Sequence, residues 1–245
     1  DPSQGDYYQA TRGGGHGDYR TLVLAPSTCQ EAYDVTIEAF DLAFTYRNPV
    51  VILGDAILGQ MKEPIHTWKT RGRPTGEGAD WALSGAKGRR PRLLKSLYLS
   101  EGALAEHHAH LVSKYDQMQS EARGEEVFTQ DADVIVVAYG SVARIAKNTV
   151  RSLRSEGHRV GLFRPVTLYP FPSHILANMA RQGKRFITIE HNTGQMVDDV
   201  RLAVRRFADS ELLPIYPGIL PKPEDFEGPI RNLIEAEQTE DTRHV

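Results

Sequence analysis

The chain has 245 residues, of which 40% are hydrophobic and 25% charged, and its net charge is −3. This composition allows one large or two ordinary globular domains and predicts no bulk attraction to nucleic acid or anionic lipid. The single cysteine excludes a disulfide framework and a four-thiolate iron–sulfur cluster on this chain. The apolar runs are strand-sized, too short for a membrane helix, so we expect a cytoplasmic protein.

The first part of the chain predicts one β-α-β unit. Residues 1–20 lack periodicity and are expected to form a loop, in which GGGHGD is either a tight glycine turn, the favoured interpretation, or an amide cradle for a phosphate. Residues 21–25 and 50–53 are short apolar strands, and Thr28 with Glu31 forms a capping box for the helix between them. Two strands and one helix do not complete a parallel sheet, so we expect more strands from upstream sequence rather than from partner chains.

The middle of the chain predicts a linker and a long helix. Residues 62–92 show no element, and their basic run AKGRRPR has no aromatic platform, which favours a surface segment over a nucleic-acid site. Residues 100–122 predict a helix that packs across a domain or subunit boundary. Its seam consists of Leu104, His108, Leu111, Tyr115 and Met118. His107 and His110 share a face, but no acidic or cysteine ligand lies at a metal-site spacing, so we favour an ordinary helix face over a metal site.

A second β-α-β unit opens the last part of the chain. Residues 134–138 form an uninterrupted apolar run, as in a strand buried on both faces. The Ser141 hydroxyl is expected to cap the next helix, and Gly157 to end it. Residues 159–163 then predict a parallel strand, and the segment after it, up to Phe171, is expected to be an exit loop.

Four further elements follow this unit. The pattern predicts a short helix, a strand, a helix and a possible strand at residues 173–181, 185–190, 195–208 and 212–215. The third of these has an apolar face formed by Val197, Val200, Val204 and Phe207. A last helix is expected at residues 223–236. Four strands alternating with helices predict a three-layer α/β domain.

Ligands of parallel sheets bind beyond the carboxyl ends of the strands. This rule selects four loops, at residues 26–28, 54–60, 139–141 and 190–194. None completes a motif, since VAYGS lacks the glycines of a dinucleotide fingerprint and no GxSxG elbow is present. Glu190 and His191 could form an acid/base pair, although ordinary packing of a strand end is the favoured interpretation.

Several blocks of sequence resemble the alpha chain of 2-oxoacid:ferredoxin oxidoreductases. They are, in order, GDYRTLVLAPSTCQEAYDVTIEAFDLAFTYRNPVVILGDAILGQMKEPI, DWALSGAKGRRPRLLKSLYLSEGALAEHHAHLVSKY, DVIVVAYGSVARIAKNTVRSLRSEGHRVGLFRPVTLYPFP and IEHNTGQMVDDVRLAV. The second block is similar to the branched-chain type, 2-oxoisovalerate (3-methyl-2-oxobutanoate):ferredoxin oxidoreductase.

The resemblance implies an α/β chain with three parts. Residues 1–66 would be the C-terminal part of a thiamine-diphosphate pyrimidine-type domain, residues 67–129 a linker excursion with a long helix, and residues 130–245 a transketolase C-terminal-like three-layer α/β domain. The N-terminal part of the thiamine domain, with the glutamate that activates the cofactor, would lie upstream, so the resemblance assigns no catalytic residue here.

The implied activity is oxidative decarboxylation of branched-chain 2-oxo acids to acyl-CoA with ferredoxin as electron acceptor, and the isolated chain is expected to be inactive. Thiamine diphosphate and Mg²⁺ would be held mainly by a partner beta chain, iron–sulfur clusters would lie on other subunits such as gamma chains, and CoA would be a cosubstrate. No metal ligand is expected here. The alternative is a non-catalytic assembly module of a 2-oxo acid dehydrogenase complex.

The resemblance also suggests which residues approach the cofactor pocket or the beta chain. The candidates are His16, Asp18, Asp55 and Gln60.

Overall fold

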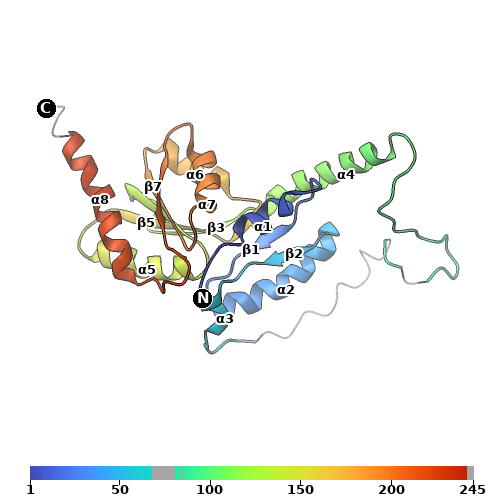
Figure 1. Cartoon of the computed structure of the whole chain (residues 1–245), viewed down its shortest axis with the longest axis horizontal. Helices are drawn as coiled ribbons and strands as arrows, with labels where there is room; N and C mark the ends of the chain where they lie inside the picture. Colours follow the sequence, from blue (N-terminus) through green and yellow to red (C-terminus); the bar gives the residue numbers. More distant parts are fainter. Residues whose placement is uncertain (68–80, 84, 242–245) are drawn as a thin grey trace.

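The structure is a computed structural model that describes residues 1–67, 81–83 and 85–241. Within these residues the strands form one sheet of three strands and one of five. The two sheets lie beside each other in the middle of the molecule, with helices packed around them (Figure 1). No helix in the described ranges combines the length and the apolar character of a membrane span.

The three-stranded sheet contains the first predicted β-α-β unit, which is confirmed. The strands β1 (Leu22–Leu24) and β2 (Val50–Ile52) pair in parallel, and α2 (Cys29–Tyr46) connects them. Residues Leu22 and Leu24 are fully buried against α2. The apolar runs therefore mark true strands, and the helix between them covers one face of the sheet.

The start of α2 follows half of the predicted capping box. Thr28 Oγ1 accepts a hydrogen bond from Glu31 N at 3.1 Å, as expected. The other half is wrong, because the Glu31 carboxylate accepts from Ser27 N and Ser27 Oγ rather than from Thr28 N. Glu31 also pairs with Arg164, at 2.6 Å, a distant partner that the local sequence does not reveal.

The third strand of this sheet, β6 (Thr167–Tyr169), comes from the exit segment for which the sequence predicts a loop, so that prediction is wrong. It runs antiparallel to β1, and Val23 pairs with Tyr169. The partner lies so far away in sequence that no local pattern indicates the pairing. The expectation of more strands from upstream sequence stays a prediction.

Residues 1–20 also differ from the loop that we expected. They contain α1 (Tyr7–Thr11) and a 3-10 turn, η1 (Gly13–Gly15). Tyr7 is fully buried and donates to Asp199 Oδ2 at 2.5 Å, and Arg12 pairs with Asp199 at 2.9 Å. These contacts with the far end of the chain order the segment, and they cannot be read from its own sequence.

The five-stranded sheet is built around the second predicted β-α-β unit, which is confirmed. The strands β4 (Val134–Val137) and β5 (Val160–Pro165) pair in parallel across α5 (Gly140–Ser155). Gly157 follows the helix with a φ of +95°, in the left-handed conformation that ends many helices.

The prediction of four strands is wrong, because this sheet has five. The parallel strands β7 (Arg185–Glu190) and β8 (Ser210–Pro214) extend it on one side in the expected places. On the other side, β3 (Gly124–Val127) runs antiparallel to β5. The sequence of β3, GEEV, is short and half charged, so it carries no apolar signal, and it falls within residues predicted to belong to the linker.

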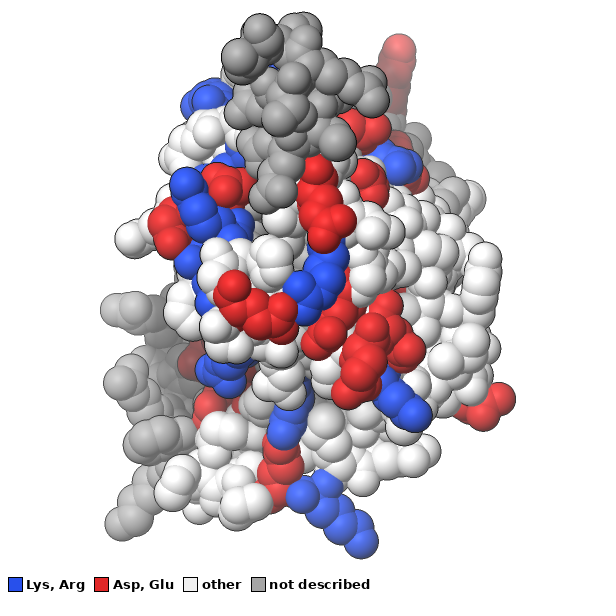
Figure 2. Space-filling view, turned by 90° about the vertical axis from the view of Figure 1, so that its left-hand side faces the viewer, with Lys and Arg blue, Asp and Glu red and all other residues white. Residues whose placement is uncertain are grey.

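Helices cover both faces of the five-stranded sheet. The helices α5 and α8 (Pro223–Asp241) enclose one apolar core, while α6 (Ser173–Arg181) and α7 (Met196–Val204) enclose another. The predicted three-layer α/β fold is thus confirmed. Phe207 is the exception on its predicted helix face, because it lies beyond α7 and is 53% exposed. Positive and negative side chains are mixed over the end of the molecule that carries α8 (Figure 2).

The long helix α4 (Ala103–Met118), followed by the 3-10 turn η2 (Gln119–Glu121), forms where predicted and projects from the sheets (Figure 1). Its predicted seam is covered only at the C-terminal end. Met118 is fully buried with Leu22 and Leu24 of β1, whereas Leu104 is 52% exposed.

Candidate functional site

Three of the four predicted loops meet where strands of both sheets end. Residues 54–55 follow β2, residues 139–141 follow β4, and residues 191–192 follow β7. Gln4 from the N-terminal segment lies between them and forms hydrogen bonds with all three. We name this cluster the polar joint, and it consists of Gln4, Asp55, Tyr139, Ser141, His191 and Asn192. It connects the two sheets at the edge where parallel sheets bind ligands.

Asp55 caps two helices at once. Its Oδ1 accepts from Leu58 N at 3.0 Å, at the start of the short helix α3 (Ala56–Gln60). Its Oδ2 accepts from Ser141 N at 3.1 Å and from Ser141 Oγ at 2.6 Å, at the start of α5. The expectation that the Ser141 hydroxyl caps α5 is therefore wrong, since that hydroxyl donates to a carboxylate that performs the capping from outside the helix. The Asp55 carboxylate thus accepts hydrogen bonds from amides at the starts of two helices.

Gln4 fills the space between the two sheets. Its backbone N donates to His191 O at 2.7 Å, and its Oε1 accepts from His191 N at 3.1 Å. Its Nε2 donates to Tyr139 O at 3.0 Å, and its backbone O accepts from Asn192 Nδ2 at 2.9 Å. Sequence reasoning missed Gln4 because all of these partners lie more than a hundred residues away.

Gly140 allows this close approach. Its φ is +57°, and a Cβ atom there would lie 3.0 Å from Gln4 Nε2 and 3.1 Å from Asp55 Oδ2. Any larger residue would therefore meet both a strained backbone and a crowded space. The glycine of VAYGS serves the contact between the sheets, not a dinucleotide.

Glu190 belongs to the framework of the fold. It is fully buried, and its carboxylate accepts from Gln195 N, Met196 N and Val197 N at 2.8–3.0 Å. These are amides at the start of α7, so the carboxylate caps that helix. An acid/base pair with His191 would need the same oxygens, and the geometry supports the packing interpretation that the sequence favours.

The imidazole of His191 is enclosed in the polar joint. It is fully buried, which lowers its pKa, although the hydrogen bond at 3.2 Å between Nε2 and Tyr216 O partly opposes the shift. Its Nδ1 has no hydrogen-bond partner among the described residues. Burial likewise raises the pKa of Tyr139 well above its ordinary value. The carboxylate of Asp55, which accepts hydrogen bonds from the starts of two helices, is therefore the charged group of the polar joint.

The four candidate residues occupy two separate places. Asp55 and Gln60 lie at the two ends of α3, and Gln60 is exposed on the wall of a surface hollow that also includes Met61. His16 and Asp18 lie in the exposed loop after η1. The structure thus brings Asp55 and Gln60 onto one element and places His16 and Asp18 on another.

The GGGHGD loop has the geometry of a tight turn. Gly13 and Gly14 have φ values of +64° and +61°, and a Cβ atom on Gly13 would lie 2.6 Å from Tyr19 O. These conformations require glycine. They support the glycine-turn interpretation of this segment.

The described residues do not by themselves fit a magnesium–diphosphate group. Among them, no cluster of three or more His, Cys, Asp or Glu side chains could hold a metal ion. Asp55 is already surrounded by helix amides and a hydroxyl. His107 Nδ1 lies 3.1 Å from the Tyr98 hydroxyl, in an ordinary side-chain contact.

Two family models match the chain. The model described as "Pyruvate flavodoxin/ferredoxin oxidoreductase, thiamine diP-binding" matches residues 1–126. The model described as "Pyruvate:ferredoxin oxidoreductase core domain II" matches residues 132–226. Together they include both sheets, and they agree with the predicted fold class.

Among curated proteins, ketoisovalerate oxidoreductase subunit VorB of Methanothermobacter thermautotrophicus is 46% identical over 205 residues, which are 82% of this chain and 57% of that protein. The 2-oxoglutarate synthase subunit KorA of Methanocaldococcus jannaschii is 32% identical, and the matched region covers 92% of this chain and 67% of that protein. The chain thus spans little more than half of the ketoisovalerate subunit that it matches.

A solved structure has the same fold. The 2-oxoglutarate:ferredoxin oxidoreductase from Magnetococcus marinus superposes with a TM-score of 0.73 at 19% identity, over 95% of this chain and 45% of that chain.

Proposed function

The chain belongs to the pyruvate:ferredoxin oxidoreductase family, and from this membership we propose that it serves as the alpha subunit, or part of it, of a branched-chain 2-oxoacid:ferredoxin oxidoreductase. The complete enzyme would oxidise a branched-chain 2-oxo acid to carbon dioxide and an acyl-CoA and pass the electrons to ferredoxin. The observation that carries the substrate class is the 46% identity to a ketoisovalerate oxidoreductase subunit.

In this proposal the cofactors are distributed over several chains. Thiamine diphosphate would supply the electron sink for decarboxylation when bound. A beta chain would hold its diphosphate and Mg²⁺, and iron–sulfur clusters would lie on other subunits, gamma chains among them. Two features of the chain support this division. Cys29 is a single cysteine, and the carboxylate of Asp55 already accepts hydrogen bonds within the chain. The enzyme would act in the cytoplasm.

The residues of this chain would position neighbouring subunits rather than react. Asp55 would fix α3 against α5, so that Gln60 faces the cofactor pocket or the beta chain from a rigid element. His16 and Asp18 would present a second contact from the glycine turn. Each of these roles is part of the proposal.

Exposed apolar residues support a binding surface for another chain of the enzyme. Along residues 93–112, which lead into α4 and form its first part, the exposed side chains include Leu93, Leu94, Leu97, Leu99, Leu104 and Val112. Several exposed apolar side chains close together along the chain are typical of a surface that binds another protein. We assign it to the beta chain.

Reconstitution tests the proposal. The chain, completed by its upstream sequence, is combined with the beta and iron–sulfur subunits, and ferredoxin reduction is measured with 2-oxoisovalerate and CoA. We expect activity only in the complete mixture and no tight binding of thiamine diphosphate with Mg²⁺ by this chain alone in calorimetry. Tight binding by the isolated chain, or activity with lipoamide instead of ferredoxin, would contradict the proposal.

Variants test the candidate contacts. His16→Ala and Gln60→Ala are each expected to weaken the complex with the beta chain, or raise the KM of the complete enzyme, by about ten-fold, equivalent to one lost polar contact. His174→Ala is the matched control, because His174 is exposed on α6, away from both candidate places. Equal behaviour of all three variants would remove these residues from the proposed contact.

A further inference from the structure

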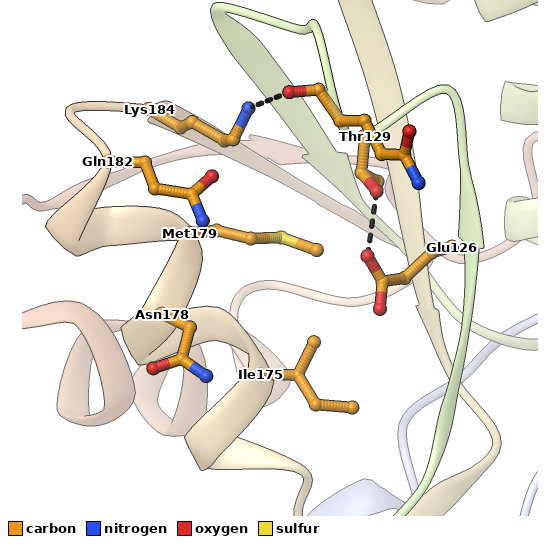
Figure 3. Close-up of a pocket in the computed structure, with 8 residues that line it drawn as sticks. Glu126, Thr129, Ile175, Asn178, Met179, Gln182 and Lys184 are labelled. Atoms are coloured by element: carbon orange, nitrogen blue, oxygen red, sulfur yellow. Dashed lines mark hydrogen bonds between the residues drawn. The ribbon is translucent and has the colours of Figure 1, made fainter.

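A cavity of about 350 Å³ lies at the edge of the five-stranded sheet opposite the polar joint. Its walls are Glu126 of β3, the segment after β3, the α6 region, and Lys184, which directly precedes β7 (Figure 3). Because β4 and β7 are parallel, residues that precede these strands and residues that follow them lie at opposite edges. The cavity therefore lies away from the polar joint, and none of the four candidate residues lines it.

Lys184 brings a buried positive charge to this cavity. The residue is only 7% exposed, and its Nζ donates to Gln130 O at 3.0 Å and to Ala132 O at 2.8 Å. An ammonium group has three N–H donors, so one remains for another acceptor. No carboxylate of the described residues forms an ion pair with it. A buried cation without an anionic partner favours binding of an anion from outside.

Glu126 brings a negative charge to the same cavity. Its Oε2 accepts from Thr129 Oγ1 at 2.7 Å, and no hydrogen bond within the described residues uses Oε1. The side chain is exposed and lies beside Thr129, away from Lys184 (Figure 3). A carboxylate in this position repels a ligand that is only anionic, and it attracts one that also carries a positive group.

The α6 wall of the cavity is apolar at its centre. Ile175 and Met179 form this wall, and the amides of Asn178 and Gln182 lie at its rim. The volume is at the lower end of the range for small-molecule sites, roughly 300–1,000 Å³. These features suit a small ligand with an aliphatic group as well as both charges.

We propose that this cavity binds a free amino acid with a small aliphatic side chain. The ligand carboxylate accepts the remaining N–H of Lys184, the ligand ammonium pairs with Glu126, and the aliphatic side chain packs against Ile175 and Met179. The site goes beyond the proposed oxidoreductase function and does not depend on it.

Calorimetric titration of the full chain tests the site. L-Valine and L-leucine are compared with 3-methylbutanoate, which has no amino group, and with isobutylamine, which has no carboxylate. We expect saturable binding of at least one amino acid, with each analogue about ten-fold weaker or worse, because each loses one charged contact. No saturable binding of either amino acid, or equal binding of an analogue, would overturn the proposal.

Variants locate the binding. Glu126→Gln is expected to weaken it about ten-fold, while Glu224→Gln, at an exposed carboxylate of α8, leaves it unchanged. Lys184→Met should abolish binding. Ile175→Trp, which fills the cavity and keeps Lys184 in place, should also abolish it, and this variant replaces Lys184→Met as the test if Lys184→Met does not fold. Undiminished binding by Ile175→Trp would show that the amino acid binds elsewhere.

Discussion

The two sheets of this molecule contain the same β-α-β unit, yet they are completed in different ways. The five-stranded sheet has an apolar core on each face, and its own strands and helices together supply most of both cores. The three-stranded sheet takes β6 from the other half of the chain, and Ile52 on its edge strand β2 is 37% exposed. We conclude that one sheet carries its own stability, whereas the other depends on contacts with its neighbour.

The largest expected effect lies in the self-contained core. Phe226 of α8 is fully buried against the five-stranded sheet, so Phe226→Ala should lower the free energy of unfolding by about 3–5 kcal/mol. Urea denaturation followed by circular dichroism measures this loss. Phe40→Ala on α2 is the matched control, since Phe40 is 75% exposed and should change stability by less than about 0.5 kcal/mol. Similar losses in the two variants would contradict the comparison.

Arg164 should show how the smaller sheet depends on the larger one. Its buried guanidinium pairs with Glu31 of α2 at 2.6 Å and with Glu125 of β3 at 2.8 Å. Arg164→Met leaves both carboxylates without this partner, and because each is about one-third exposed we expect a loss of about 2–3 kcal/mol.

Hydrogen exchange assigns that loss to a region. In Arg164→Met, amides of α2 should exchange faster than amides of α8. Arg201→Met is the control, because Arg201 pairs with the exposed Asp209 and should contribute little. Uniform acceleration across both sheets would argue against a dependent half.

Asp55 should have a somewhat smaller and more local effect. Asp55→Ala removes the cap from α3 and α5 together, and we expect a loss of about 2 kcal/mol. Ser141→Ala removes only the hydroxyl contact and should lose about 1 kcal/mol. Denaturation curves measure both losses, and a Ser141→Ala loss equal to that of Asp55→Ala would show that the carboxylate caps neither helix effectively.

The smallest effect is a pH dependence at the surface between the two halves. The hydrogen bond from Arg144 of α5, with a further one from Cys29 N, lowers the pKa of Glu63 from its ordinary 4.5 to about 2. A carboxylate with a lowered pKa stabilises the fold above its unfolded-state pKa, and this contribution is lost as the pH falls from 4.5 toward 2.

The matching experiment follows the urea midpoint against pH. Glu63→Gln should flatten the acid limb between pH 4.5 and 2, and its curve should meet the wild-type curve near pH 2. Glu211→Gln, at an exposed carboxylate of β8, should leave the limb unchanged. Identical limbs for Glu63→Gln and the wild type would remove Glu63 as the cause.

The larger sheet could be predicted well because its signals are local. The run 134–137, the stripe of α5 and the glycine after it specify strand, helix and turn within one short stretch of chain. The strand β3 could not be predicted from the sequence, because a short edge strand needs no apolar pattern. The strand β6 could not be predicted either, because its sequence does not indicate which sheet it joins.

The site was predictable only as a set of loops. The rule for carboxyl ends of strands selected the segments that meet in the polar joint, but not the contacts inside it. Gln4 and the double cap by Asp55 depend on packing between distant segments, and no spacing encodes them. Lys184 also could not be recognised from the sequence, because what distinguishes it is burial against two carbonyl groups, with no carboxylate partner among the described residues.

The pairing of β1 with β6 has a consequence for synthesis on the ribosome. When Val23 leaves the exit tunnel, its partner Tyr169 has not yet been translated. At the usual 5–20 residues per second, the intervening stretch takes roughly 7–30 s to make. For much of that interval the strand LVL has an open edge on a nascent chain, so this segment should be a preferred client of ribosome-associated chaperones.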